Sequence, residues 1–122
     1  MNFVHLSMTP TELQNMISSK ERMNYSMIDL RERRLYNQFH LEGAINIDYD
    51  TFMQQDSYEA ILKNKTAVIL YCERGGSSIY AAKRLTDYCR KHGKEHRIYS
   101  LSGGMAGYQR KFGSSSRSIG IY

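Results

Sequence analysis

An almost unbroken apolar run over residues 66–71, with the sequence TAVILY, constrains the fold of this chain more than any other segment. A strand that is buried on both faces of a sheet needs such a run, whereas the strands of a half-exposed antiparallel sheet alternate apolar and polar residues. We therefore expect a central parallel strand here. Along the rest of the chain, segments of strand character alternate with segments of helix character, which predicts an α/β domain with a mainly parallel sheet.

Capping and turn residues indicate the other elements. Thr9, Pro10 and Glu12 form a strong helix start, with Thr9 as the N-cap and Glu12 completing a capping box. We expect strands at residues 3–5, 25–29, 44–47 and 97–101, and helices that begin after Thr9 and span residues 57–63, 78–91 and 105–111.

The length of 122 residues and the composition, with 41% hydrophobic and 24% charged residues, are typical of one compact domain. We expect this domain over residues 1–112 and a loosely ordered tail, rich in serine and glycine, over residues 113–122. The longest apolar run is too short to cross a bilayer, and the first ten residues lack a basic region followed by an apolar core. These features predict a cytoplasmic protein without a membrane partner.

Charge is distributed unevenly along the chain. Residues 1–61 contain 5 Lys and Arg against 9 Asp and Glu, whereas residues 62–122 contain 12 against 3. A basic half can favour nucleic acid, an anionic lipid surface or a small anionic substrate, although most such charge covers solvent-exposed helix faces. Because the chain has no recognisable nucleic-acid-binding motif, we expect no nucleic acid partner and a simpler use of the charge around an anion site.

Cys72 directly follows the predicted central strand and precedes a glycine-containing turn and a helix. Ligands of open α/β sheets bind at the carboxyl ends of the strands, where loop amides and a helix N-terminus favour a thiolate or a bound anion. Gly75 and Gly76 allow backbone conformations in which several N–H groups converge, and Arg74 adds a cation. Cys72 is therefore the candidate nucleophile, and the alternative is a small buried cysteine of the core.

The second cysteine and the histidines offer no comparable site. Cys89 lies about 16 Å along the expected helix at ~1.5 Å per residue, which is too far for a disulfide with Cys72. We expect Cys89 to be a packing residue. His92 and His96 are four residues apart, but an intervening glycine interrupts any helix between them, so we expect neither a metal site nor a cofactor.

Three motifs together resemble those of the rhodanese family. The first lies within residues 28–47 and comprises IDLRE, Tyr36 and HLEGAINI; the second is the cysteine loop; and the third is LSGGMAGY at residues 101–108. They occur in the family's order and cover most of the chain. The resemblance implies a rhodanese-like α/β fold whose five-stranded, mainly parallel sheet is flanked by helices on both faces.

The resemblance also implies sulfur transfer. In that family the loop cysteine, here Cys72, attacks the outer sulfur of thiosulfate or a related anionic donor, becomes a persulfide and passes the sulfur to cyanide or a thiol. The acceptor thiol can belong to a protein persulfide carrier. The substrate-binding residues would be Glu73, Arg74, Gly75, Gly76 and Ser77, whose backbone N–H groups would hold the persulfide. Arg74 would attract the donor. Asp29 and Arg31 match family residues that brace the loop, although an ordinary ion pair at a strand end explains them equally well.

The loop departs from the family pattern Cys-Arg-x-Gly-x-Arg, because Glu73 and Ser77 stand at the two arginine positions, and Phe39 replaces a glycine of the first motif. A carboxylate beside the cysteine weakens binding of a dianion such as thiosulfate, and the missing arginine removes a bidentate clamp. The alternative function is therefore a non-catalytic or regulatory module that binds persulfide or relays it to a protein partner. A phosphatase or arsenate reductase of related fold is a third hypothesis, but its oxyanion-binding arginine would fall at Ser78.

Overall fold

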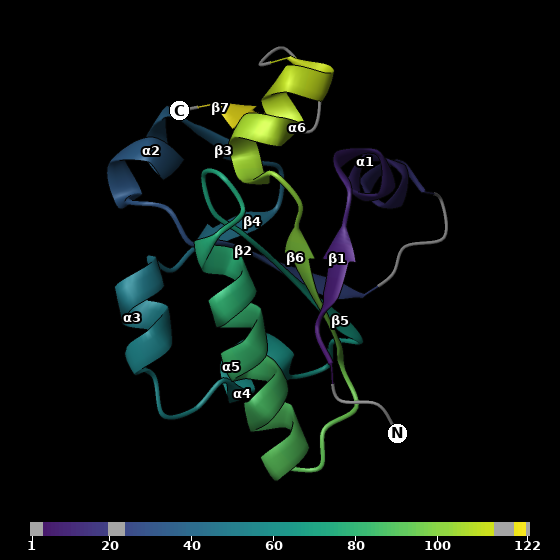
Figure 1. Ribbon diagram of the computed structural model, residues 1–122, viewed down its shortest axis with the longest axis vertical. Coiled ribbons are helices and arrows are strands. Elements are labelled where there is room, and N and C mark those ends of the chain that lie inside the picture. Colours follow the sequence, from purple (N-terminus) through teal and green to yellow (C-terminus); the bar gives the residue numbers. More distant parts are fainter. Residues whose placement is uncertain (1–3, 20–23, 114–118, 122) are drawn as a thin grey trace.

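A five-stranded parallel sheet positions the rest of the molecule. The structure, a computed structural model, describes residues 4–19, 24–113 and 119–121. The strands are arranged in the order β1 (Leu6–Met8), β6 (Arg97–Leu101), β5 (Ala67–Tyr71), β2 (Tyr25–Asp29) and β4 (Ala44–Asn46) (Figure 1). Every residue of β5 is buried, as the apolar run predicts for a central strand. The expected α/β fold is confirmed.

Helices cover both faces of this sheet, as expected. One face carries α3 (Tyr49–Gln54), α4 (Glu59–Leu62) and α5 (Ser77–Lys91), and the other carries α1 (Pro10–Ser18) and α6 (Gly104–Phe112) (Figure 1). Alternate residues of β5 point to opposite faces and so serve two separate cores. Val68 and Leu70 pack with the first group of helices. Ile69 and Tyr71 pack with the second.

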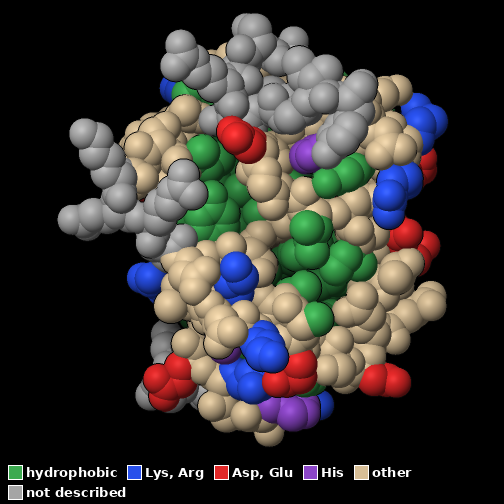
Figure 2. Space-filling view, turned by 180° about the vertical axis from the view of Figure 1, so that it is seen from behind, with side chains coloured by type: hydrophobic (Ala, Val, Ile, Leu, Met, Phe, Trp, Pro, Cys, Tyr) green, Lys and Arg blue, Asp and Glu red, His purple; other side chains and the backbone are tan. Residues whose placement is uncertain are grey.

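The core beneath α1 and α6 has more partly buried side chains packed against it than the core beneath α5. Among the described residues, seven partly buried hydrophobic side chains pack against it, compared with four around the core beneath α5. Seen from the side opposite to Figure 1, apolar side chains reach the surface beside charged ones (Figure 2). Within the part of the chain that the structure describes, no helix has the length and apolarity needed to cross a membrane.

The register of the strands brings three strand ends to one edge of the sheet. Asp29 at the end of β2 lies opposite Tyr71 in β5 and Asn46 in β4. The backbone N–H of Leu30 donates to the carbonyl oxygen of Tyr71 at 2.8 Å. The segments that follow β2 and β5 therefore leave the sheet side by side, and the second of them begins with Cys72.

Several elements differ from the sequence-based expectations. The strand expected at residues 3–5 begins instead at Leu6, where the chain pairs with Tyr99 of β6. The helix expected over residues 57–63 is a single turn, α4. Two further elements, α2 (Arg33–Gln38) and β3 (Phe39–Leu41), and the helix α3 were not predicted, because segments of three to six residues are too short to show a period. The capping box at Thr9 is confirmed.

The expected tail over residues 113–122 contains a further strand. This strand, β7 (Ile119–Ile121), pairs antiparallel with β3, with Ile119 opposite Leu41. Its two isoleucines are β-branched and favour extended backbone. Residues 114–118 and 122 of the tail lie outside the described residues. The domain boundary at residue 112 stays a prediction.

Candidate active site

Cys72 lies at the carboxyl end of β5, and five residues later the chain enters α5 at Ser77 (Figure 1). The cysteine is 8% exposed, whereas Arg74, Gly76 and Ser77 are exposed. Among the described residues, no side chain caps the start of α5. The sulfur therefore lies below an exposed rim, next to a helix start whose amides have no side-chain acceptor.

A backbone amide already contacts the sulfur. The N–H of Gly75 donates to Cys72 Sγ at 3.1 Å. Gly75 has a φ of 96°, and a Cβ on it would lie 2.9 Å from the backbone nitrogen of Gly103, so this position requires glycine. Gly76 is different, because its φ is −77° and no atom lies within 4 Å of the place its Cβ would take. Of the two glycines of the loop, Gly75 therefore has a backbone conformation that favours glycine, whereas the conformation of Gly76 is open to other residues.

The start of α6 holds the loop from the other side. The N–H groups of Met105 and Ala106 donate to the carbonyl oxygens of Cys72 and Glu73, each at 2.9 Å. Gly104 lies so close that a Cβ would sit 2.5 Å from the carbonyl oxygen of Cys72. The two glycines at the start of α6 thus let its first amides reach the loop backbone, which fixes the direction of the loop.

Asp29 and Arg31 lie beneath the loop, and Arg31 connects to it. Asp29 is inaccessible and Arg31 is 5% exposed. Arg31 Nη2 donates to Asp29 Oδ2 at 2.9 Å, and its Nη1 lies 3.3 Å from Glu73 Oε1. Burial opposes the charge of Arg31, but the hydrogen bonds and the charge of Asp29 outweigh it and raise the pKa of Arg31. Asp29 holds Arg31, and Arg31 in turn pairs with the first loop residue.

Tyr71 is a site residue that the sequence analysis missed. Its hydroxyl donates to Asp29 Oδ2 at 2.8 Å and accepts the N–H of Leu41 at 3.1 Å. Burial, followed by the charge of Asp29, raises the pKa of Tyr71 above its usual range. The only sequence signal is a tyrosine at the end of an otherwise aliphatic strand, directly before the cysteine.

The charges around Cys72 are more balanced than the sequence alone indicates. The side chain of Glu73 is 46% exposed and pairs with Arg31. Arg74 is exposed and makes no hydrogen bond or ion pair within the described part of the chain. Ser78 is buried, and its hydroxyl donates to the carbonyl oxygen of Gly75 at 3.4 Å. Of the two charged side chains in the loop, Glu73 is paired, and Arg74 is therefore the one that can meet an anion from solvent.

Cys89 and the histidines serve other parts of the fold. Both cysteines are free, and Cys89 is 1% exposed within the core beneath α5. Burial raises the pKa of the Cys89 thiol to about 11. His92 Nδ1 lies 2.9 Å from the carbonyl oxygen of Tyr88, and His96 Nε2 lies 3.0 Å from that of Leu62. Across residues 4–19 and 24–113, no three His, Cys, Asp or Glu side chains are grouped as metal ligands.

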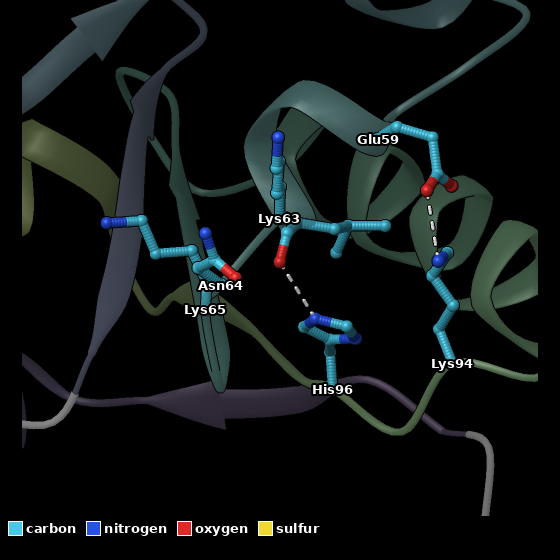
Figure 3. Close-up of a pocket in the computed structure, with 7 residues that line it drawn as sticks. Glu59, Lys63, Asn64, Lys65, Lys94 and His96 are labelled. Carbon is cyan, nitrogen blue, oxygen red and sulfur yellow. Dashed lines mark hydrogen bonds and ion pairs between the residues drawn. The ribbon is translucent and has the colours of Figure 1, made fainter.

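A pocket of about 500 Å³ lies at the opposite end of the sheet, where β5 and β6 begin. Its polar side chains come from Glu59, Lys63, Asn64, Lys65, Lys94 and His96 (Figure 3). Lys94 pairs with Glu59 at 3.0 Å, and the side chains of Lys63 and Lys65 point in different directions (Figure 3). These lysines do not converge on one anion, so the pocket does not compete with the cysteine loop as a candidate site.

Comparison with solved structures shows this fold in other proteins. The As-Sb reductase from Leishmania major superposes with a TM-score of 0.76 at 16% identity, over 96% of this chain and 86% of that one. A Saccharomyces cerevisiae homolog of single-domain rhodanese and of the Cdc25 phosphatase catalytic domain gives 0.75 at 21% identity, over 96% and 88%. The reduced Bacillus anthracis CoADR-RHD gives 0.71 at 22% identity, over 98% of this chain. The chain spans only 18% of that longer protein.

The family assignment rests on a match that covers most of the chain. The family model of the Rhodanese-like domain matches residues 9–111, from the N-cap of α1 to the last turn of α6. The match includes the cysteine loop, the buried Asp29–Arg31 pair and the glycines of α6. The chain belongs to the rhodanese-like domain family.

Proposed function

We propose that this protein is a sulfurtransferase that carries a sulfane sulfur on Cys72 as a persulfide. The Cys72 thiolate attacks the outer sulfur of the donor, and the sulfur–sulfur bond of the donor breaks. With thiosulfate as donor, sulfite leaves with the bonding electron pair. The acceptor thiolate or cyanide then attacks the outer sulfur of the persulfide, and Cys72 leaves as a thiolate. Donor and acceptor alone balance both steps.

The observation that supports this proposal most strongly is the N–H of Gly75 directed at Cys72 Sγ at 3.1 Å. Backbone amides stabilise a thiolate or the terminal sulfur of a persulfide without a proton transfer. The uncapped start of α5 adds further amides at the same place. In this proposal Glu73, Arg74, Gly75, Gly76 and Ser77 surround the persulfide, and Asp29 and Arg31 brace the loop from below.

The substrates in this proposal are a small anionic sulfur donor and a thiol or cyanide acceptor. Arg74 is the cation that meets the donor. The carboxylate of Glu73 opposes a dianion, but its pairing with Arg31 at 3.3 Å reduces this effect. We therefore expect thiosulfate to react, and to react more slowly than a donor of lower charge.

A regulatory module that binds or relays persulfide is the second candidate, and the absence of arginine at Glu73 and Ser77 favours it. Two of the structural neighbours are named as an As-Sb reductase and as a homolog of single-domain rhodanese and of a phosphatase catalytic domain. In this chain the position of the oxyanion-binding arginine is the buried Ser78, which cannot clamp an oxyanion as an arginine does. We therefore do not extend those activities to this protein.

Intact-mass measurement tests the proposal. The reduced protein is incubated with thiosulfate, and we expect it to gain one sulfur atom. Cys72→Ala should gain none, whereas Cys89→Ala, the matched control, should gain sulfur as the parent does. If the parent gains no sulfur from thiosulfate, mercaptopyruvate or a protein persulfide, the sulfurtransferase proposal fails and the regulatory module is supported.

A further inference from the structure

We propose that the first two turns of α5 form a docking surface for an acidic protein that exchanges sulfur with Cys72. This surface consists of Ile79, Tyr80 and Lys83, with Arg74 on the preceding loop, and is called here the α5 surface. The inference rests on the proposed function, because it names a partner for the same site. Besides Arg74, which belongs to the loop, it adds binding determinants on α5 itself.

The α5 surface exposes large apolar side chains next to the reactive loop. Ile79 is 39% exposed and Tyr80 is 60% exposed, in the first turn of a helix whose other apolar residues face the core. The N–H of Ile79 donates to the carbonyl oxygen of Gly76 at 3.2 Å, and the adjacent Gly75 contacts Cys72 Sγ. A partner that covers Ile79 and Tyr80 therefore lies next to the loop that contains the sulfur.

The charge of the α5 surface is positive and unbalanced. Lys83 Nζ lies 5.8 Å from the ring centre of Tyr80, and neither Lys83 nor Arg74 forms an ion pair within the described residues. The nearest acid before the helix, Glu73, is paired with Arg31. The next acid along the helix is Asp87, one turn beyond Lys83. Asp87 pairs with Arg90 at 3.4 Å. Within the described part of the chain, the loop and the first two turns of α5 therefore present Arg74, Lys83 and the positive end of the helix dipole, while the neighbouring carboxylates of Glu73 and Asp87 are paired.

These features fit a protein better than other anions. Tyrosine and arginine are enriched at the centres of protein interfaces, where exposed apolar area is buried. A nucleic acid needs a row of cations along its phosphates, and this surface offers two cations beside an isoleucine. Arg84 does not add a third, because it donates to the hydroxyl of Tyr58 at 2.8 Å and to the carbonyl oxygen of Gln55 at 3.0 Å. The partner we infer carries Asp or Glu and an apolar side chain close to its own cysteine.

The transfer step gives a direct test. Two synthetic peptides carry a central Phe-Cys pair, flanked by Asp and Glu in one and by Lys in the other. The peptide thiolate attacks the outer sulfur of the Cys72 persulfide, the sulfur–sulfur bond breaks, and Cys72 leaves as a thiolate. At low ionic strength we expect the acidic peptide to accept sulfur about tenfold faster than the basic one. Equal rates would overturn the proposal.

Two charge reversals on the same helix locate the effect. Lys83→Glu should abolish the preference for the acidic peptide. Lys91→Glu, the matched control, lies about 12 Å further along α5 at ~1.5 Å per residue and should keep the preference. Transfer to cyanide should be the same in the parent and both variants, because cyanide needs no docking surface. A preference that survives in Lys83→Glu would overturn the assignment to this surface.

Binding without chemistry separates this inference from the proposed function. The acidic peptide, with serine in place of cysteine and a fluorescein label, is titrated with Cys72→Ser protein by fluorescence anisotropy. Tyr80→Ser should weaken binding about fivefold, and circular dichroism confirms that the variant is folded. Failure of the parent to load sulfur would then reject only the proposed function. Absence of binding, or tighter binding of a labelled single-stranded oligonucleotide, would reject the docking surface.

Discussion

Cys72 and Cys89 are both nearly inaccessible, with 8% and 1% of their surfaces exposed, yet they lie in regions of different character. Cys72 begins a loop whose amide contacts its sulfur and whose rim is exposed. Cys89 lies in α5 among the side chains of the core beneath that helix. Burial raises the pKa of Cys89 to about 11. The loop amide and the exposed rim at Cys72, against the apolar surroundings that raise the pKa of Cys89, distinguish a candidate nucleophile from a packing residue.

Different interactions stabilise the loop that contains Cys72 and the core that contains Cys89. The loop is fixed by hydrogen bonds from α6 and by the ion pair between Arg31 and Glu73. Around Cys89, apolar side chains of α5, α4 and the sheet pack against one another. Variants that remove charge should therefore affect the loop, whereas variants that remove volume should affect the core around Cys89.

The largest expected difference is in thiol reactivity. At pH 8 a thiol with a pKa of about 11 is ionised in only about one molecule per thousand, and Cys89 is also buried. We expect iodoacetamide to modify Cys72 at least about 100-fold faster than Cys89 in the folded protein. Peptide mapping after timed quenching measures both rates. Comparable rates would show that the loop does not activate Cys72.

Removal of Arg31 should give the largest loss of stability. Arg31→Ala leaves the inaccessible carboxylate of Asp29 without its cation, which costs about 3–5 kcal/mol for a buried pair. Arg34→Ala is the matched control, because Arg34 and Glu32 form an exposed pair at 3.7 Å that contributes less than about 1 kcal/mol. Urea unfolding measures both changes. Equal losses for the two variants would contradict a structural role for the Asp29–Arg31 pair.

The sequence predicts the framework of this site better than its interior. The apolar run over residues 66–71 predicts the central strand, and the position of Cys72 behind that strand predicts its place at the edge of the sheet, because both follow from local patterns. The pairing of Arg31 with Glu73 could not be predicted, because 42 residues separate them and the register of β2 and β5 decides that they meet. The negative charge of Glu73, which the sequence indicates to be unfavourable to anion binding, is therefore partly compensated by Arg31 in the fold.

The interaction of Tyr71 with Asp29 was missed for a related reason. Both residues end strands, and only the pairing of β2 with β5 places them opposite each other. Glycine is required at Gly75 because the backbone at Gly103 lies close to it, whereas Gly76 has open space around it. A glycine pair in the sequence does not indicate which of its members a neighbouring helix approaches. Long-range register and packing thus determine the details that local patterns leave open.

A methyl group at Gly104 should disturb the loop without touching Cys89. Gly104 has a φ of 61°, and a Cβ would lie 2.5 Å from the carbonyl oxygen of Cys72 and 2.7 Å from that of Glu73. We expect Gly104→Ala to lower the free energy of unfolding by about 2 kcal/mol and to slow iodoacetamide modification of Cys72. Modification measured at a temperature where the variant is fully folded separates the two effects.

Gly107→Ala is the control on the same helix. Its Cβ would meet Arg110 Nη2 and the carbonyl oxygen of Ser102 at 3.5 Å, which is ordinary contact. Alanine is a better helix former than glycine, so this variant should be stabilised by about 0.5–1 kcal/mol. Modification of Cys72 should be unchanged. A slower reaction in Gly107→Ala as well would mean that α6 as a whole, and not the close approach at Gly104, controls the loop.

Among the variants expected to destabilise the protein, the one that removes the second thiol should have the smallest effect. Cys89→Ala deletes one buried sulfur atom and should cost about 1 kcal/mol at pH 8. Because the pKa of Cys89 is raised in the folded protein, its stabilising contribution is complete below its ordinary pKa of 9.0 and is lost as the pH rises through about 11. Two pKa units correspond to about 2.7 kcal/mol, which exceeds the cost expected at pH 8. The stability difference between the parent and Cys89→Ala should therefore shrink above pH 9 and change sign before pH 11. Urea unfolding of both proteins at each pH measures this difference, and the titrations of all other groups are common to both proteins and drop out of it.

A stability difference that stays constant with pH would mean that the thiolate of Cys89 is tolerated inside the fold. The contrast between the two cysteines would then rest on the loop amide alone.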